Sequence, residues 1–357
     1  SMATVEEAFS VEAVTKEFFL KYAELFNRIN DALVEILEKD KAVRSEFTAK
    51  NIKPEDFAKK LMGQIVFLYF LQKKGWLGVE KDQDWGTGSR DFMRQLVNGK
   101  YGTYENFFND ILEPLFYDTL ATDRGHEAWC NRFKRRIPFL NGGLFEPLND
   151  YDWKNTNILI PNSLFTNNDD VEEGITGTGV LNIFDRYNFT VNESEPLEKE
   201  VAIDPEMLGK VFENLIEDNR RKGLGAFYTP REIVHYMCQE SLINYLDTVL
   251  NKEKDVVVPR EDIEVLIHFG EQYSHFENAK KNGTKGDHYP SLPKGLREHA
   301  RLIDEALEAI TVCDPAVGSG AFLVGMMTEI VRVRSSLTPF FNDIRDRSPY
   351  FFKRHAI

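Results

Sequence analysis

Apolar residues recur at steps of three and four positions along the first part of the chain, the spacing of one face of an α-helix. The repeat starts near Val14 and predicts a long amphipathic helix. A second apolar segment, residues 65–71, ends before two lysines and Gly75 and is shorter than the ~20 residues that cross a bilayer. We expect it to form a buried core helix. The apolar positions of the first repeat are Phe18, Phe19, Tyr22, Leu25, Phe26, Ile29, Leu33, Ile36 and Leu37.

The pattern changes after residue 76, where helical stretches alternate with turn signals. Residues 138–147 contain an Asn-Gly-Gly core that needs positive φ angles and predicts a tight turn. Short β-like runs at 158–161 and 187–191 lie in a polar region. The composition becomes charged just before residue 200, where we place a domain boundary. We therefore expect a mainly α domain over residues 1–200.

The second part, residues 201–357, predicts the start of an α/β domain. Residues 251–300 are charged and contain His and Gly, so we expect a loop-like insertion there. Further on, residues 309–313 form a short β-type run, residues 314–320 a glycine-bearing turn, and residues 321–331 an apolar run at helical spacing. Strand, turn and helix in this order open a doubly wound sheet, which binds ligands beyond the carboxyl ends of its strands.

The turn at 314–320 carries the strongest chemical signal. Gly318 and Gly320 remove side chains where a ligand must approach the backbone, and the helix start offers free N–H groups to a carboxylate or phosphate. Asp314 can accept a hydrogen bond or face a cationic group. A phosphate-binding P-loop would need Gly-Lys-Ser/Thr, which is absent, and Leu323 spoils the third small position of a dinucleotide fingerprint. An adenosyl cofactor without a pyrophosphate fits best, with an ordinary strand-to-helix turn as the alternative.

A second signal lies upstream, in a Phe-Tyr-Thr-Pro segment. Thr229 is a natural N-cap, Pro230 suits the first helical position, and Glu232 can complete a reciprocal capping pair. A well-capped helix explains these three residues completely. Phe227 and Tyr228, immediately before the cap, would also form a platform for a purine and its carboxylate-bearing tail. The segment alone leaves both interpretations open.

The charge balance argues against a free-standing DNA-binding module, because 44 Lys and Arg stand against 58 Asp and Glu, a formal net charge of −14. Of two basic stretches, residues 132–136 and 220–222, we expect at least the first to be a solvated surface. The amino terminus lacks a signal-peptide core, and the seven histidines show no metal-ligand spacing. We expect a cytoplasmic protein that neither enters a membrane nor holds a metal. Cys130, Cys238 and Cys313 are expected to be unpaired buried thiols.

Together the two segments resemble the gamma class of amino-methyltransferases that act on DNA. The Phe-Tyr-Thr-Pro segment is similar to their first motif. Residues 314–323 are similar to their cofactor motif, Asp-Pro-Ala-Cys-Gly-Ser-Gly-x-Phe-Leu, with Val317 in place of Cys. The resemblance implies that the intact enzyme uses S-adenosyl-L-methionine to methylate adenine N6 in double-stranded DNA. We expect this chain alone to bind the cofactor weakly or not at all. The implied cofactor-binding residues are Phe227, Tyr228, Thr229, Pro230, Asp314, Pro315, Ala316, Gly318, Ser319, Gly320 and Phe322.

The resemblance extends to the type IIG restriction–modification enzymes, in which a nuclease, a helical connector, a methyltransferase and a target-recognition domain share one polypeptide. Residues 138–147, residues 204–215 and the amino-terminal helices carry it, so it covers most of the chain. It implies a mainly α connector domain over residues 1–200. The incomplete start of an α/β Rossmann-like methyltransferase domain would follow over residues 201–357. Mg²⁺ would be needed only by a nuclease domain in the parent.

The chain departs from this family where methyl transfer takes place. The catalytic Asn/Asp-Pro-Pro-Tyr/Phe tetrapeptide is missing, since no Pro-Pro pair occurs in the 357 residues, and we expect it beyond Ile357. We therefore assign no catalytic residue and expect the fragment to be inactive. Residues 152–154, Asp-Trp-Lys, fit half of a nuclease signature, but no partner acid stands out and we treat them as a chance match. Two alternatives remain open: a methyltransferase of the same core that acts on RNA or protein, and a non-catalytic scaffold in a phage-defence complex.

Overall fold

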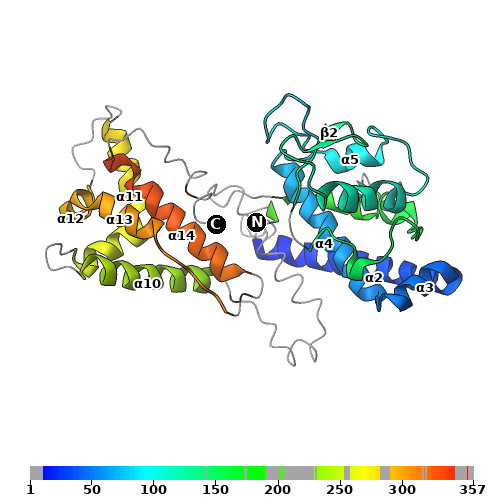
Figure 1. The fold of residues 1–357 in the computed structure, drawn as a ribbon, viewed down its shortest axis with the longest axis horizontal. Coiled ribbons are helices and arrows are strands. Elements are labelled where there is room, and N and C mark those ends of the chain that lie inside the picture. The colour runs from blue at the N-terminus through cyan, green and yellow to red at the C-terminus, as the bar shows by residue number, and fades with distance from the viewer. Residues whose placement is uncertain are drawn as a thin grey trace. The chain divides into compact units, whose positions relative to one another are not determined.

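The computed structural model divides into two compact units, Ser1–Asp218 and Asn219–Ile357, which we call unit 1 and unit 2 (Figure 1). Each unit has its own buried hydrophobic cluster. The centre of the predicted Asn-Gly-Gly turn, the segment 204–215 and the basic stretch 220–222 lie outside the described residues. The structure describes residues 11–140, 143–172, 175–189, 202–203, 229, 231–252, 258–281, 290–315, 317, 320–341 and 352.

Two long helices of unit 1 confirm the predictions from the apolar repeat. They are α2 (Val11–Lys39) and α4 (Pro54–Lys73), which contains the predicted core segment. α4 begins well before that segment because Pro54 suits a first helical turn, where its missing N–H is not needed. Glu55 and Asp56 in the same turn complement the helix dipole. The fully buried side chains of α2 include Phe18, Tyr22, Leu25, Ile29 and Leu33.

Shorter helical elements pack around these two helices. α3 (Lys41–Ala49) is capped by Asp40, whose carboxylate accepts hydrogen bonds from the backbone N–H groups of Ala42 and Val43 at 2.8 and 3.1 Å. The remaining described helical elements of unit 1 are α5 (Phe92–Val97), the π-helices η1 (Phe108–Leu112) and η2 (Pro114–Leu120), the 3-10 helices η3 (Leu148–Asp150) and η4 (Asn162–Leu164), and α6 (Val180–Phe184).

The described strands of unit 1 are short and form three two-stranded ladders. One strand lies within the predicted β-like run 187–191, and its parallel partner carries unit 1 past residue 200. The other predicted run, 158–161, is not a strand, although Ile158 and Ile160 are buried. The pairs are β1 (Trp129–Cys130) with β2 (Arg135–Arg136), β3 (Asp170–Glu172) with β4 (Ile175–Thr176), and β5 (Asn188–Phe189) with β6 (Ala202–Ile203).

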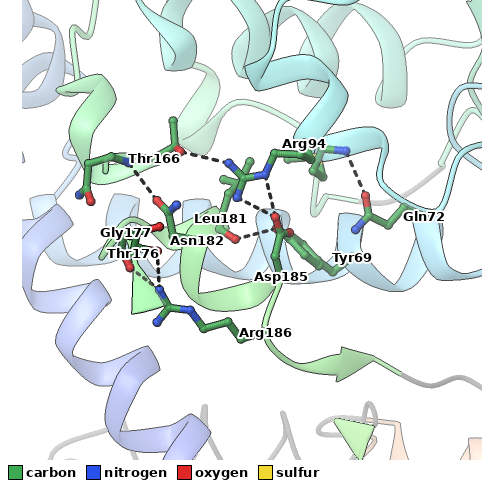
Figure 2. Close-up of polar contacts among 12 residues, drawn as sticks. Tyr69, Gln72, Arg94, Thr166, Thr176, Gly177, Leu181, Asn182, Asp185 and Arg186 are labelled. Carbon is green, nitrogen blue, oxygen red and sulfur yellow. Dashed lines mark hydrogen bonds and ion pairs between the residues drawn. The ribbon is translucent and has the colours of Figure 1, made fainter. Parts of the chain in front are cut away.

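A polar network centred on Asp185 fastens the end of α6 to α4 and α5 (Figure 2). The Asp185 carboxylate accepts a hydrogen bond from the Tyr69 hydroxyl at 2.6 Å and pairs with the Arg94 guanidinium at 2.6 Å. Arg94 also donates to the Thr166 hydroxyl at 3.1 Å. Burial, reinforced by the Asp185 charge, holds the pKa of Tyr69 well above its ordinary value, so its hydroxyl remains a hydrogen-bond donor. The network therefore joins segments that are far apart in the sequence.

All described elements of unit 2 are helices, and aliphatic side chains fill the space between them. α13 and α14 are also joined by a buried ion pair, in which Arg334 Nε lies 2.7 Å from Asp304 Oδ1. The elements are α10 (Arg231–Leu250), α11 (Arg260–Lys281), α12 (Lys294–Glu298), α13 (Ala300–Glu308), α14 (Ala321–Leu337) and the 3-10 helix η5 (Thr338–Phe340).

The expected loop-like insertion at 251–300 is wrong for its central part, which forms α11 and is one of the longer helices of the chain. The apolar residues Ile263, Leu266 and Ile267, followed by Gly270, recur at helical spacing and are all buried. The charged residues lie between them and at the helix ends. This segment therefore buries one face in the core of unit 2. The charged runs that suggested a loop, 252–255 and 282–287, lie almost entirely outside the described residues.

The β-type run at 309–313 is not part of a strand in the structure. A strand needs a neighbouring chain to accept and donate its backbone hydrogen bonds, and no described residue of unit 2 supplies one. Val312 is 40% exposed, which differs from the buried position that a central strand would give it. The Rossmann-like sheet remains a prediction from the sequence.

Candidate functional site at the starts of α10 and α14

The turn before α14 depends on a left-handed glycine. Gly320 has φ 80° and ψ 10°, a conformation that costs an L-residue with a side chain roughly 1–2 kcal/mol. Its N–H donates to the carbonyl of Val317 at 2.7 Å, and its own carbonyl accepts the Val324 N–H at 2.9 Å, the first bond of the helix. The N-cap residue of α14 is this glycine, which has no side chain with which to cap the helix. A glycine at this position leaves the first N–H groups of α14 to other partners, as an anion-binding helix start requires.

The start of α10 is described less completely. Thr229 is half-buried, and α10 begins at Arg231. Along α10 the buried face is formed by Val234, Cys238 and Leu242, at the steps expected for a helix. The helix predicted to follow the Thr-Pro sequence is therefore confirmed. The capping role of Thr229 stays a prediction.

α10 and α14 pack closely through their first turns. A Cβ atom built on Gly325 would lie 2.8 Å from Val234 Cγ1 and 3.4 Å from Cys238 Sγ. The Cys238 thiol also donates to the backbone carbonyl of Phe322, with a sulfur–oxygen distance of 3.7 Å. Both helices begin at the same end of unit 2 (Figure 1). The structure thus brings together the helices that follow the two motif segments.

A buried carboxylate joins the two helices one turn further on. Glu329 of α14 is 2% exposed, and its Oε1 lies 2.7 Å from Nδ1 of His235 on α10. Its Oε2 accepts hydrogen bonds from Gln239 Nε2 at 3.3 Å and from Arg332 Nε at 3.0 Å. Arg332 in turn donates to the backbone carbonyl of Ile267 on α11. Sequence reasoning missed this network, although a lone Glu on an apolar helix is a signal that a buried partner is needed.

The three cysteines differ from one another in exposure. Cys130 and Cys238 are buried and unpaired, as expected, but Cys313 is exposed, so the prediction of three buried thiols is wrong for it. Cys313 follows exposed residues in the segment that lacks strand partners. Burial, with a smaller contribution from the Glu329 charge, raises the pKa of the Cys238 thiol to about 11. Cys238 is therefore a neutral hydrogen-bond donor at pH 7 and a poor nucleophile.

The predicted cofactor-binding residues are only partly described. Asp314 is half-buried, Pro315 lies in an exposed turn, and Phe322 is half-buried in the first turn of α14. Their joint geometry around a ligand is therefore a prediction. The predicted residues within the described part are Thr229, Asp314, Pro315, Gly320 and Phe322, and those outside it are Phe227, Tyr228, Pro230, Ala316, Gly318 and Ser319.

The structure also bears on the nuclease-like tripeptide and on metals. Asp152 accepts a hydrogen bond from Asn155 Nδ2 at 2.7 Å, and Lys154 Nζ lies 3.5 Å from Asp118. Among the described residues, no group of three or more His, Cys, Asp and Glu side chains could hold a metal ion. Within the same part of the chain, no helix combines the length and the apolar character that crossing a membrane requires.

Comparison with known proteins gives one informative relative. The chain is 27% identical over 370 aligned positions to a protein of Methanocaldococcus jannaschii named "putative type II restriction enzyme and methyltransferase RM.MjaORFECS2P". No protein-family model and no solved structure matches the chain. The alignment covers 94% of this chain but 27% of the relative, so the chain spans about a quarter of that protein's length. The chain is thus similar, in almost all of its length, to part of a protein named for both restriction and methyl transfer.

Proposed function

We propose that this chain is the cofactor-binding start of a restriction–modification methyltransferase that acts on adenine N6 in DNA. The similarity to a protein named restriction enzyme and methyltransferase supports the methyltransferase and restriction–modification parts of the proposal. The two sequence motifs support the cofactor and the gamma class. The observation that carries the proposal is the contact between the first turns of α10 and α14, because each helix directly follows one motif.

The proposed ligand is S-adenosyl-L-methionine. In this proposal the adenine ring of the cofactor stacks near Phe227 and Tyr228. The methionine end of the cofactor lies near Thr229 and the turn at 314–320. The left-handed Gly320, an N-cap residue without a side chain, supports an approach of the ligand to the backbone. A carboxylate at Asp314 adds a hydrogen-bond acceptor for the ligand. No pyrophosphate has to be accommodated, in agreement with the absence of a Gly-Lys-Ser/Thr sequence.

The proposed reaction needs positioning more than it needs acid or base catalysis. Bound S-adenosyl-L-methionine would supply a methyl group activated by its sulfonium. The lone pair of adenine N6 would attack this carbon, the carbon–sulfur bond would break, and S-adenosylhomocysteine would leave as a neutral thioether. The amino nitrogen then loses one proton to solvent or to a neighbouring base. The adenine must leave the DNA stack to reach the methyl group. The protein contributes alignment and electrostatic stabilisation, and this step needs no metal ion.

The 357 residues alone are not expected to complete this reaction. They contain no Pro-Pro pair and therefore no catalytic tetrapeptide of the proposed family. We expect weak cofactor binding by this chain, with a dissociation constant on the order of 1 mM, which corresponds to about 4 kcal/mol. We expect no methyl transfer from it.

Saturation-transfer difference NMR detects binding in this weak range and gives the first test. We expect a signal from S-adenosyl-L-methionine that S-adenosylhomocysteine displaces and that ATP does not. Asp314→Ala should abolish the signal, whereas Glu305→Ala, on an exposed side of α13, should leave it intact. No transfer to S-adenosyl-L-methionine at millimolar concentration would contradict the proposed cofactor site.

Labelled methyl transfer tests the reaction itself. A longer polypeptide that contains this chain and a catalytic tetrapeptide should label double-stranded DNA, and digestion should yield N6-methyladenine. Label in RNA or protein instead would favour the alternative substrates. Transfer to DNA by the 357-residue chain would show that the expected inactivity of the fragment is wrong.

A further inference from the structure

We infer that Gly325 is a positioning residue that sets the separation of α10 and α14, and through it the geometry of the cofactor site. The effect on the helices follows from the described contacts alone. The effect on the cofactor rests on the proposed function. Neither sequence motif includes Gly325, and nothing in its sequence context marks it as part of a site.

Two nearby glycines in this region are needed for different reasons. Gly320 has φ 80°, and a Cβ atom there would meet no atom of the described residues within 4 Å, so its backbone conformation requires glycine. Gly325 lies inside α14 and has no positive φ, so any residue could adopt its backbone conformation. A glycine in a helix interior costs about 1 kcal/mol relative to alanine. The glycine at position 325 is instead required by lack of space, because a Cβ atom there would lie 2.8 Å from Val234 Cγ1.

The surrounding contacts prevent the helices from sliding to make room. Before Gly325 on α14, the Phe322 carbonyl accepts a hydrogen bond from the Cys238 thiol. After Gly325, the Glu329 carboxylate makes hydrogen bonds with His235 and Gln239. An added methyl group would therefore have to push α10 away from α14 until carbon atoms reach their usual separation of about 3.5–4.0 Å. Binding sites lose function when their parts move by more than about 0.5 Å. Thr229 and Gly320 precede these helices, so their separation would change too.

A second glycine supplies a matched control. Gly270 of α11 faces the C-terminal end of α14, where an added Cβ atom would lie 3.1 Å from the side chain of Ser336. Gly270→Ala therefore adds the same methyl group to another close helix contact of α14, far from the first turn along the helix. If added crowding in the core alone weakens cofactor binding, both variants should lose affinity. If the helix separation at the site is what matters, only Gly325→Ala should lose affinity.

The first experiment measures helix separation without any ligand. In a background with Cys130→Ser and Cys313→Ser, the reaction rate of the Cys238 thiol with Ellman's reagent reports how tightly α14 covers this thiol of α10. We expect Gly325→Ala to raise this rate about tenfold, the change that 1.4 kcal/mol of local opening produces. Val234→Ala added to Gly325→Ala should restore the original rate, because it removes the atom in the way. Gly270→Ala should not change the rate.

The second experiment measures S-adenosyl-L-methionine affinity by NMR titration of the same variants. We expect Gly325→Ala to weaken binding at least about fivefold, the double variant to recover it, and Gly270→Ala to match the unaltered chain. Equal loss in both glycine variants, or no rescue by Val234→Ala, would overturn the positioning role. If Gly325→Ala does not fold, Val234→Ala alone decides, since a loosened contact should still expose Cys238.

The two proposals fail in different ways. If the unaltered chain does not bind S-adenosyl-L-methionine, the proposed function fails and the cofactor part of this inference fails with it. The thiol rates would still decide whether Gly325 sets the helix separation. If the unaltered chain binds the cofactor and Gly325→Ala binds equally well despite a faster thiol reaction, the proposed function stands and the inference is wrong.

Discussion

The buried cluster of unit 1 is rich in Phe and Tyr, whereas the described buried cluster of unit 2 consists of Leu, Ile, Val and Ala alone. In unit 1 tilted, edge-on and stacked rings surround Phe184, whose ring centroid lies 5.6 Å from that of Phe18 and 5.4 Å from that of Tyr69. In unit 2 the helices approach more closely where glycine replaces a side chain, as at Gly325 and Gly270. Large rings hold elements apart at fixed distances, while small residues let helix backbones meet.

The two units also differ in the apolar side chains that they leave exposed. In unit 2, apolar side chains along the start of α10 and α14 are open to solvent. Tyr236 is 60% exposed, Val324 54% and Met237 48%. Unit 1 has isolated exposed apolar residues, of which Leu20 and Leu159 are the most open. The candidate site therefore lies beside exposed apolar side chains, and contacts such as that of Gly325 with Val234 hold its two helices together.

The largest expected effect comes from removing the ring at the centre of the unit 1 core. Phe184 is fully buried, so Phe184→Ala should destabilise unit 1 by about 3–5 kcal/mol through lost burial and an unfilled cavity. All four tryptophans of the chain lie in unit 1. Urea unfolding followed by tryptophan fluorescence therefore measures this unit alone.

Leu246→Ala in unit 2 is the matched control. Leu246 is also fully buried, and its truncation should lower the free energy of unfolding of unit 2 by about 2–5 kcal/mol. Both units are helical, so unit 2 is followed by the part of the circular dichroism change that does not coincide with the tryptophan transition. It should leave the tryptophan transition in place. An equal shift of the tryptophan transition would mean that the two units unfold as one, and the comparison between them would lose its basis.

Breaking the buried ion pair between Asp304 and Arg334 should have the next largest effect on stability. Asp304→Ala should cost about 3 kcal/mol, because it leaves Arg334 without its closest carboxylate in a site where both side chains are buried. Circular dichroism during urea unfolding checks this. Asp304→Leu combined with Arg334→Met should recover most of the loss. If the double variant is as unstable as Asp304→Ala, packing rather than an uncompensated charge accounts for the effect.

Glu113 of unit 1 predicts a dependence of stability on pH. It is fully buried, its Oε1 accepts a hydrogen bond from the Tyr151 hydroxyl at 2.5 Å, and burial raises its pKa from 4.5 to about 9. The folded protein thus keeps a proton that the unfolded chain releases between these two pH values. The stability of unit 1 should fall as pH rises from about 4.5 to 9, by about 1 kcal/mol per pH unit near neutrality.

The tryptophan transition at pH 5, 7 and 9 measures this dependence. Glu113→Gln should remove the slope, since an amide does not titrate, while Glu127→Gln at an exposed position should keep it. The same slope in Glu113→Gln and in the unaltered chain would show that other groups cause it. Unit 2, followed by circular dichroism, should lack this contribution.

The comparison also shows what the sequence could predict. Periodicity gave α2 and α4 because their apolar residues are close in sequence and face one core. The same periodicity is present in α11, but the charged runs that flank this helix favour a loop in the sequence. The Asp185 network could not be predicted, since its hydrogen bonds to Tyr69 and Arg94 join residues 116 and 91 positions apart.

The candidate site divides in the same way. Local rules gave the glycine at 320 and the helices after both motifs, because turn and helix chemistry depend on neighbouring residues. The contact of Gly325 with Val234 depends on how two helices cross, which no local pattern encodes. The run at 309–313 shows the converse case. Its β propensity is local, but a strand also needs a partner, and none is present in the described part of unit 2.

The smallest expected effect tests the exposed face of unit 2 directly. Met237 is 48% exposed on α10, so Met237→Gln should change the stability of unit 2 by no more than about 0.5 kcal/mol. Leu246 lies on the same helix and is fully buried, so Leu246→Ala should lower the stability of unit 2 several times more than Met237→Gln. Circular dichroism during urea unfolding compares the two. A loss above about 2 kcal/mol for Met237→Gln would mean that this face is covered in solution, and sedimentation would then show whether a second copy covers it.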